Sequence, residues 1–244
     1  MKKFIVANWK MCGRVESSKI WAQKIIARQI PAEREVVVCP PTALLSILKD
    51  ALGESAVKLG GQDCHAKDEG AYTGETSAQL LKDLGCEYVI VGHSERRSYQ
   101  MENNEIVRAK AICAIKTGLI PVICIGETGK QRENGKTLEV IKQQIAESVP
   151  DEAGLGNFLL AYEPVWAIGS GKLPTMDEIK QVHEAIKTSI SERKKIDVAG
   201  VYVLYGGSVK PDNAADILGL SSVSGVLVGG ASLNADDFYK IILG

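Results

Sequence analysis

The chain has 244 residues, of which 45% are hydrophobic and 24% charged, and its formal net charge is −1. These proportions are typical of a soluble globular protein, and the near-zero charge argues against a nucleic-acid-binding protein, which usually carries a basic face. No apolar run approaches the roughly 18 residues that a membrane span needs, so we expect no membrane segment.

The six cysteines, at positions 12, 39, 64, 86, 113 and 124, include no Cys-x-x-Cys pair. The first residues, from Met1 to Met11, lack the apolar core and the small-residue cleavage site of a signal peptide. We therefore expect reduced thiols and a cytoplasmic protein.

Short β-rich runs recur along the chain, and the stretches between them have the helical spacing of apolar residues, as at Ile141, Ile145 and Val149. In chain order the runs are Phe4–Asn8, Glu35–Cys39, Val57–Gly61, Glu87–Val91, Leu119–Ile125, Asn157–Tyr162, Val201–Gly206 and Ser224–Gly229. Runs that are apolar almost throughout are typical of parallel strands buried on both faces. Eight of them alternating with helices favour a closed (β/α)8 barrel over an open sheet.

Barrels of this length usually form one domain, and the chain has no low-complexity linker. We therefore expect residues 1–244 to form a single catalytic domain. Helix-start patterns support the division into elements: Thr175 with Glu178 fits a capping box, Asn234 can cap the last helix, and Pro211 suits a first helical turn.

Active sites of (β/α)8 barrels gather at the carboxyl ends of the strands. Asn8 and Lys10 follow the first predicted strand, His93 and Glu95 follow the fourth, and Glu163 follows the sixth. A carboxylate desolvated at a strand end is costly unless it works as a base, so Glu163 is the best single candidate for a catalytic base.

Each of these residues also has a purely structural interpretation. Lys10 could be a solvated lysine at a strand end, and a histidine such as His93, standing alone, is more often a hydrogen-bonded core residue. The position of His93, directly after an apolar strand and before the helix that begins with SERR, favours a functional role. His65 and His183 lack that setting, and we expect them to be structural.

Two glycine clusters, Gly206–Ser208 and Gly229–Gly230, follow the seventh and eighth predicted strands. They could be tight turns, but loops at these two places frequently form the phosphate site of a barrel. The clusters therefore predict a phosphorylated substrate, with Ser208 as a phosphate ligand.

Three other motif matches fail. Residues 168–172 (IGSGK) look like a nucleotide-binding loop, but Trp166 and Leu173 stand where glycine and a hydroxyl residue are needed. The H-x-E pattern at His93 has no accompanying P-C-x-x-C of a zinc deaminase, and residues 206–210 lack the final glycine of a nucleophile elbow. We expect no metal and no cofactor.

Five motifs in chain order resemble the triosephosphate isomerase family from one end of the chain to the other. They are Ala7–Lys10 (ANWK), Gly92–Arg97 (GHSERR), Ala161–Gly169 (AYEPVWAIG), Tyr205–Val209 (YGGSV) and Gly225–Leu233 (GVLVGGASL). The resemblance implies a glycolytic and gluconeogenic isomerase that interconverts dihydroxyacetone phosphate and D-glyceraldehyde 3-phosphate through an enediolate.

By this resemblance Glu163 is the base, His93 is the electrophile, Lys10 supplies positive charge, and Asn8 and Glu95 support the site. The residues implied in binding the substrate and its phosphate are Asn8, Lys10, Gly169, Ser208, Gly229 and Gly230. The stretch Pro164–Thr175 resembles the family's lid, which closes over the substrate.

The stretch Gly70–Glu75 resembles the family's dimer loop and implies a homodimer, with Thr73 near the partner's Asn8 and the partner's Glu95. Three departures from the family pattern stand out, of which one, Ser170 in place of threonine, is minor. Cys12 stands where the family generally has asparagine, which predicts a dimer interface sensitive to thiol reagents. Leu173-Pro174 replaces the more usual Thr-Ala in the lid, and because proline has no N–H to donate to Tyr205, we expect the closed lid to be held differently.

Two alternatives remain open at this point. A different phosphate-binding barrel, acting on a larger sugar phosphate, would need another base after another strand. A barrel without catalytic activity would be expected to lack at least one of Glu163, His93 and Lys10, and all three are present.

Overall fold

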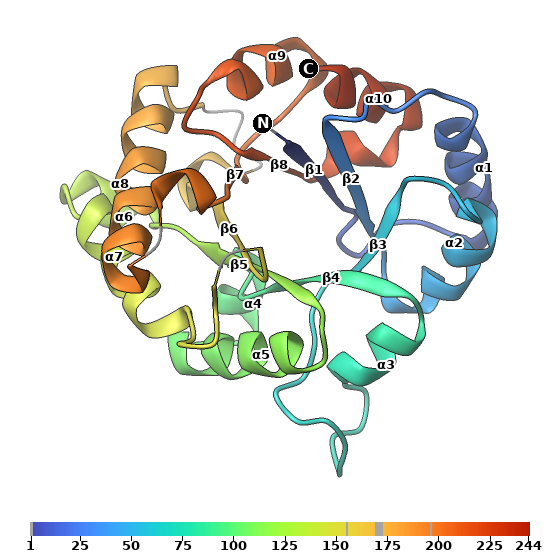
Figure 1. The fold of residues 1–244 in the computed structure, drawn as a ribbon, viewed down its shortest axis with the longest axis horizontal. Helices are drawn as coiled ribbons and strands as arrows, with labels where there is room; N and C mark the ends of the chain where they lie inside the picture. The colour runs from blue at the N-terminus through green and yellow to red at the C-terminus, as the bar shows by residue number, and fades with distance from the viewer. Residues whose placement is uncertain (1, 155, 169–172, 196) are drawn as a thin grey trace.

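The computed structural model describes residues 2–154, 156–168, 173–195 and 197–244. Eight parallel strands form a closed barrel in which each strand pairs with the next and β8 pairs with β1 (Figure 1). The strands are β1 (Lys3–Asn8), β2 (Arg34–Cys39), β3 (Lys58–Gly61), β4 (Cys86–Val91), β5 (Ile120–Ile125), β6 (Leu159–Tyr162), β7 (Val203–Tyr205) and β8 (Gly225–Val228). The predicted (β/α)8 barrel is confirmed, and every predicted strand is present within two residues of its expected bounds.

Helices surround the barrel on the outside (Figure 1). They are α1 (Val15–Ile26), α2 (Leu45–Leu52), α3 (Ala78–Asp83), α4 (Ser94–Tyr99), α5 (Asn104–Lys116), α6 (Gly129–Glu133), α7 (Thr137–Ser148), α8 (Met176–Lys194), α9 (Pro211–Gly219) and α10 (Ala235–Leu243), with the 3-10 turns η1 (Thr42–Leu44), η2 (Val165–Ala167), η3 (Val198–Gly200) and η4 (Gly230–Leu233). The predicted helix starts are confirmed: Thr175 and Glu178 form a capping box, Asn234 caps α10, and Pro211 is the first residue of α9.

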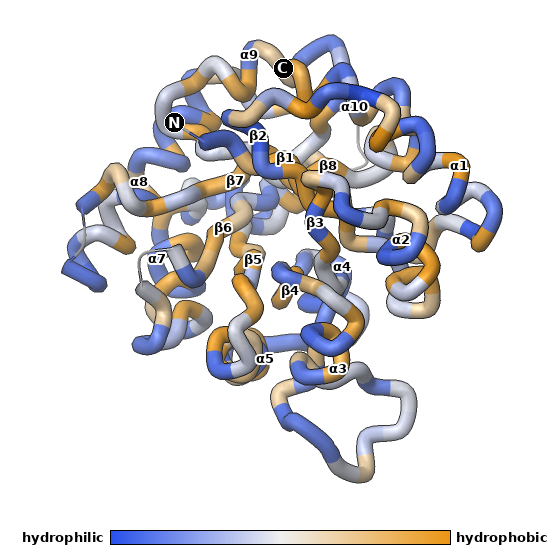
Figure 2. Tube along the Cα trace, turned by 45° about the vertical axis from the view of Figure 1, so that its right-hand side comes forward, coloured by the Kyte–Doolittle hydropathy of each residue, from blue (hydrophilic) through white to orange (hydrophobic). Residues whose placement is uncertain are grey.

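The alternation of side chains along the strands divides the core into two clusters, and Figure 2 shows the apolar strands at the centre of the molecule. The larger cluster fills the space between the strands and the helices. The smaller one takes alternate strand residues and fills the inside of the barrel: Phe4, Val6, Val37, Cys39, Tyr88, Ile90, Val122, Cys124, Leu159, Ala161, Leu204 and Leu227.

This alternation also positions the site. Asn8 lies two residues beyond Val6, Glu163 two beyond Ala161, and Gly229 two beyond Leu227, so each continues the inward-facing row of its strand. Apolar residues fill the barrel below this level, and polar groups stand at its carboxyl end.

All six cysteines are free thiols, and five of them are buried while Cys12 is exposed. Within the described part of the chain, no helix has the length and apolar character to cross a membrane.

Candidate active site

The end of β1 carries the first two polar groups of the site. The Asn8 side chain is buried and accepts a hydrogen bond from the Lys10 backbone N–H at 3.0 Å. Lys10 has φ +53°, a left-handed conformation that is uncommon for a residue with a side chain and is found at strained functional positions. Its backbone carbonyl accepts a hydrogen bond from the Gln62 amide at 2.8 Å. The Lys10 ammonium donates to Glu95 Oε1 at 2.5 Å, so it stands inside the barrel mouth with a carboxylate partner.

His93 follows β4 and is the N-cap residue of α4. Its Nδ1 accepts a hydrogen bond from the Glu95 N–H at 3.2 Å, and its Nε2 lies 2.9 Å from Glu163 Oε1. Because Nδ1 needs its lone pair for the Glu95 N–H, the hydrogen-bond network assigns the ring proton to Nε2, which donates to the carboxylate. Burial lowers the pKa of His93, but the Glu163 and Glu95 carboxylates together raise it by more, so this pKa lies above its ordinary value.

Glu163 follows β6 and is 2% exposed. Its backbone N–H donates to the Ile125 carbonyl at 2.8 Å, which ties the residue to the end of β5. Its Oε2 accepts the Ser94 N–H at 2.8 Å, at the start of α4. Burial raises the pKa of the Glu163 carboxyl, but His93, the Ser94 N–H and the Lys10 charge together lower it by more, so it is a buried carboxylate anion.

A recess of about 270 Å³ connects these groups with the loops after β7 and β8. Its lining includes seven of the predicted site residues: Asn8, Lys10, His93, Glu163, Ser208, Gly229 and Gly230. Gly206 also lines it, and a Cβ at that position would lie 2.9 Å from Glu163 Cγ, so glycine leaves the space that the carboxylate occupies. The recess has room for a small molecule and is lined by Lys10 and by the glycine loops after β7 and β8.

Two predicted residues lie outside this recess. Glu95 lines a second, adjacent recess and contacts two residues of the first, Lys10 through its carboxylate and His93 through its backbone N–H. Thr73 lies on the exposed loop between β3 and α3 that projects from the barrel (Figure 1). Gly169, predicted to bind phosphate, lies outside the described residues.

The sequence analysis missed several residues that hold the site. Ser94 donates to Glu163 through its backbone, so its side-chain type gave no signal. Gln62 reaches the Lys10 and Cys39 carbonyls from the end of β3, and its position just after a predicted strand was the only available hint. Gly126, after β5, packs directly against the Glu163 backbone.

The two expected structural histidines are placed as follows. His183 is fully buried, with its ring centroid 5.9 Å from that of Tyr162 and 6.3 Å from that of Tyr205. His65 stacks against Tyr72, and its Nδ1 accepts the Lys67 N–H. Neither residue lines the two recesses at the barrel mouth.

The fold and the site together define a class of protein: a (β/α)8-barrel enzyme equipped for proton transfer on a small anionic substrate. A buried carboxylate can act as a base, an imidazole N–H and an ammonium can stabilise developing negative charge, and the glycine loops after β7 and β8 can receive a phosphate.

The family model described as "Triosephosphate isomerase" matches residues 3–244. The chain is 48% identical over 241 residues to a triosephosphate isomerase of Ruegeria sp. strain TM1040, an alignment that covers 99% of this chain and 97% of the relative. It is 46% identical to that of Mesorhizobium japonicum, covering 99% of this chain and 95% of the relative. The solved structure of triosephosphate isomerase from Bartonella henselae has 43% identity and a TM-score of 0.91, covering 99% of this chain and 98% of that one. The chain belongs to the triosephosphate isomerase family and is an isomerase.

Proposed function

We propose that this enzyme interconverts dihydroxyacetone phosphate and D-glyceraldehyde 3-phosphate, a step of glycolysis and gluconeogenesis, with Glu163 as the base. The observation that carries the proposal is the pairing of the buried Glu163 carboxylate with His93 Nε2 at 2.9 Å, inside a recess that the phosphate loops also line. Family membership supports triose phosphate as the substrate.

The Glu163 carboxylate takes the proton from the hydroxymethyl carbon of dihydroxyacetone phosphate. The electron pair of that C–H bond forms the enediolate double bond, and the carbonyl oxygen becomes negatively charged. The proton of the C1 hydroxyl passes to the C2 oxygen, which becomes the C2 hydroxyl, and the protonated Glu163 returns a proton to C2, so that C1 is left as the aldehyde. Glu163 Oε1 lies against His93 Nε2 and Oε2 accepts the Ser94 N–H, so the substrate must displace these contacts to reach the carboxylate.

His93 Nε2–H and the Lys10 ammonium stabilise the oxygen charge of the enediolate. The Glu95 N–H at Nδ1 keeps the imidazole neutral while Nε2–H donates. Once a ligand separates Glu163 from the ring, the main group that raises the pKa of His93 is removed, which favours the neutral form. Asn8 and Glu95 hold Lys10 in place, through the Lys10 backbone and ammonium respectively. The chemistry moves protons and neither adds nor removes electrons, so it calls for no redox cofactor.

The substrate phosphate is proposed to bind Ser208, Gly229, Gly230 and the Gly169 backbone. Support comes from η4, which begins at Gly230, because Gly229, Gly230 and Ala231 at its start all line the recess. The segment Pro164–Thr175 is proposed to act as a lid that excludes water from the enediolate.

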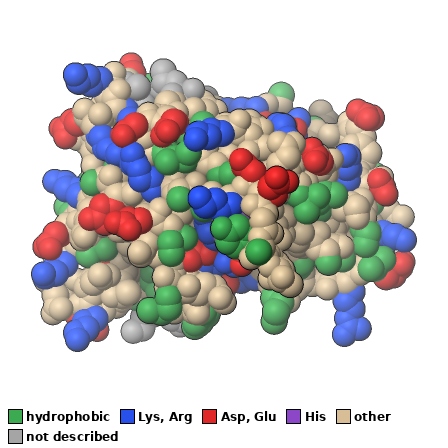
Figure 3. All heavy atoms as spheres, turned by 90° about the horizontal axis from the view of Figure 1, so that it is seen from below, with side chains coloured by type: hydrophobic (Ala, Val, Ile, Leu, Met, Phe, Trp, Pro, Cys, Tyr) green, Lys and Arg blue, Asp and Glu red, His purple; other side chains and the backbone are tan. Residues whose placement is uncertain are grey.

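We further propose that residues 1–244 act as one catalytic domain in a cytoplasmic homodimer. The loop carrying Thr73 projects far from the barrel, and Met11, Tyr99 and Met101 are large side chains that lie 78–96% exposed near the second recess. Figure 3 faces the side from which the loop projects and shows hydrophobic side chains among charged ones. Sedimentation of the native chain and of a variant lacking residues 70–75 tests this: a monomeric native chain would contradict it.

The function is tested by following glyceraldehyde 3-phosphate formation from dihydroxyacetone phosphate, with Glu163→Gln assayed in parallel. We expect turnover in the native enzyme and a loss of about 10²–10⁴-fold in the variant, because the amide cannot accept the proton. Folded native enzyme without turnover would contradict the substrate. Undiminished turnover in Glu163→Gln would contradict the assignment of the base.

A further inference from the structure

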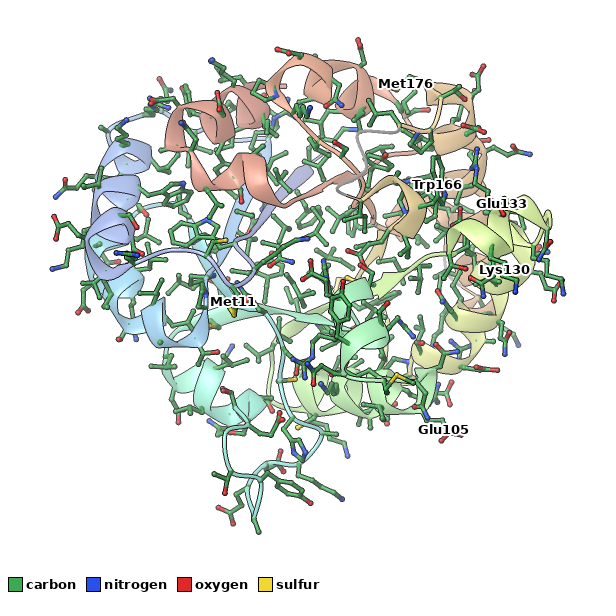
Figure 4. The ribbon with its side chains drawn as sticks, turned by 180° about the vertical axis from the view of Figure 1, so that it is seen from behind. Met11, Glu105, Lys130, Glu133, Trp166 and Met176 are labelled. Atoms are coloured by element: carbon green, nitrogen blue, oxygen red, sulfur yellow. The ribbon has the colours of Figure 1, made fainter. Side chains whose placement is uncertain are left out.

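Two lysines and one carboxylate line the recess at the mouth of the barrel: Lys10, Lys210 and Glu163. Figure 4 shows this end of the barrel, with Met11, the residue after Lys10, at its mouth. The Lys10 ammonium is paired with Glu95 at 2.5 Å, and Glu163 is a buried anion. Apart from Lys210, one positive charge therefore faces two negative charges, a balance that repels an incoming phosphate dianion.

Lys210 is the cation that changes this balance. It is exposed and lies two residues after Ser208, in the loop that follows β7. Among the residues that the structure describes, none accepts a hydrogen bond from its ammonium or forms an ion pair with it. A solvated surface side chain is the ordinary interpretation of such a lysine, but two further observations distinguish Lys210 from one.

The first observation is that the backbone of Lys210 is held in place beside Ser208. Pro211 disfavours helical backbone in the residue before it, and Lys210 is extended, with φ −137° and ψ 162°. The Asn213 side chain accepts the Lys210 N–H at 2.8 Å through Oδ1 and donates through Nδ2 to the Ser208 carbonyl at 3.1 Å. One side chain therefore ties Lys210 to the residue that is proposed to bind the phosphate.

The second observation is that lysine is a poor residue for this position in a helix. Lys210 is the N-cap of α9, where serine, threonine, asparagine and aspartate are preferred because their side chains accept a backbone N–H. A cation at the N-terminus of a helix is also unfavourable with the helix dipole. Residues that oppose a local structural preference are expected at functional positions, and this one lines a recess.

We propose that Lys210 recognises the substrate phosphate by supplying the unpaired positive charge of the recess, while Lys10 stabilises the charge on the reacting oxygens. This inference rests on the proposed function, in which Ser208 and the glycines after β8 bind that phosphate. Lys210, Ser208 and the start of η4 line the same recess. Because Lys210 is exposed, water and salt screen its charge, so we expect its loss to weaken phosphate binding only about two- to fivefold.

The test compares the kinetics of dihydroxyacetone phosphate conversion at low ionic strength. Lys210→Gln should raise KM about two- to fivefold and keep kcat within about twofold of the native value, because the charge acts on phosphate binding and not on the reacting carbons. Lys210→Arg keeps the charge and should restore the native KM. Lys142→Gln removes the same charge from an exposed position on α7, outside both recesses, and should leave KM unchanged. The difference between native enzyme and Lys210→Gln should shrink in about 1 M salt, where the screening length is about 3 Å.

Two further readouts separate recognition of phosphate from structural damage. The inhibition constant of inorganic phosphate, competing with dihydroxyacetone phosphate, should rise about two- to fivefold in Lys210→Gln. Lys210→Ser supplies a preferred N-cap residue, so its unfolding temperature should equal or exceed the native one while its KM rises as in Lys210→Gln. Weaker phosphate binding in a variant that is no less stable is not expected from damage to α9.

The outcomes that overturn this inference differ from those that overturn the proposed function. If the native enzyme converts dihydroxyacetone phosphate, but Lys210→Gln has the native KM and the native phosphate inhibition constant, this inference fails and the proposed function stands. A rise in KM that is the same at low and high salt, or that Lys142→Gln shares, also overturns it. If the native chain does not convert this substrate, the proposed function fails. Calorimetric titration of inorganic phosphate into the native and Lys210→Gln chains then decides this inference, and equal binding overturns it.

Discussion

Gly126 offers a sharp test of how tightly the carboxylate proposed as the base is positioned. It follows β5 and lies against the backbone of Glu163, where an added Cβ would be 1.8 Å from the Glu163 carbonyl oxygen and 2.6 Å from its carbonyl carbon. Cβ contacts shorter than 3.0 Å essentially do not occur, so Gly126→Ala must displace one backbone by roughly 1 Å or more. A misplacement of about 1 Å at the reacting groups costs on the order of 10²-fold in rate.

Gly225→Ala is the matched control. Its Cβ would be 2.0 Å from the Phe4 carbonyl oxygen, an equally severe backbone clash, but at the amino ends of β1 and β8, away from the mouth of the barrel. Both substitutions should lower the free energy of unfolding by about 1–3 kcal/mol or more, because both overpack the barrel wall.

The assay is kcat for glyceraldehyde 3-phosphate formation per folded molecule, with the folded fraction taken from urea unfolding. We expect Gly126→Ala to lose about 10²-fold in kcat and Gly225→Ala to stay within about threefold of the native enzyme. A Gly126→Ala enzyme with native kcat, or equal losses in both variants, would refute the argument that this glycine sets the position of the base.

Three further outcomes are expected. Burial lowers the pKa of His183 to about 3, against an ordinary value of 6.5, so the unfolded chain binds a proton that the folded chain excludes. The free energy of unfolding should therefore decrease as the pH falls below about 6.5, by up to about 1.4 kcal/mol per pH unit. Chemical unfolding at several pH values should show a shallower decrease for His183→Gln, and an equal decrease in both proteins would contradict this. Cys12 is exposed, whereas the other five thiols are buried. In the proposed dimer, a thiol reagent that modifies Cys12 should shift sedimentation toward the monomer, and the Cys12→Ser dimer should be unaffected by the reagent. Labelling of Cys12 that leaves the dimer intact would contradict the proposed sensitivity. The Tyr205 hydroxyl is buried and has no hydrogen-bond partner among the described residues, and Pro174 offers it no N–H, so Tyr205→Phe should change kcat by less than about twofold; a loss of tenfold or more would show that this hydroxyl holds the closed lid.

The strands could be predicted from the sequence alone, because each depends on the residue types within one short stretch. Eight apolar runs alternating with helical spacing predicted the barrel. Because barrel sites gather at the carboxyl ends of the strands, Glu163 could then be picked out directly after the sixth run. The candidate site residues were then identified from the residue types at the strand ends and from their match to family motifs. The N-cap roles of Thr175 and Asn234 could also be predicted, because a helix cap depends on neighbours within three or four positions.

Contacts between residues far apart in the chain were decided by the closed barrel. Ser94 and Glu163 are 69 positions apart, and their hydrogen bond exists because β4 and β6 end at the same rim. The structural role of Gly126 and the contact between Arg132 and Trp166 likewise depend on how β5, α6 and β6 meet. Sequence periodicity specifies which face a side chain occupies, because that depends on the local backbone repeat. The distance between two strand ends follows from the tilt and register of the whole barrel, so only the tertiary structure could show which of these groups touch.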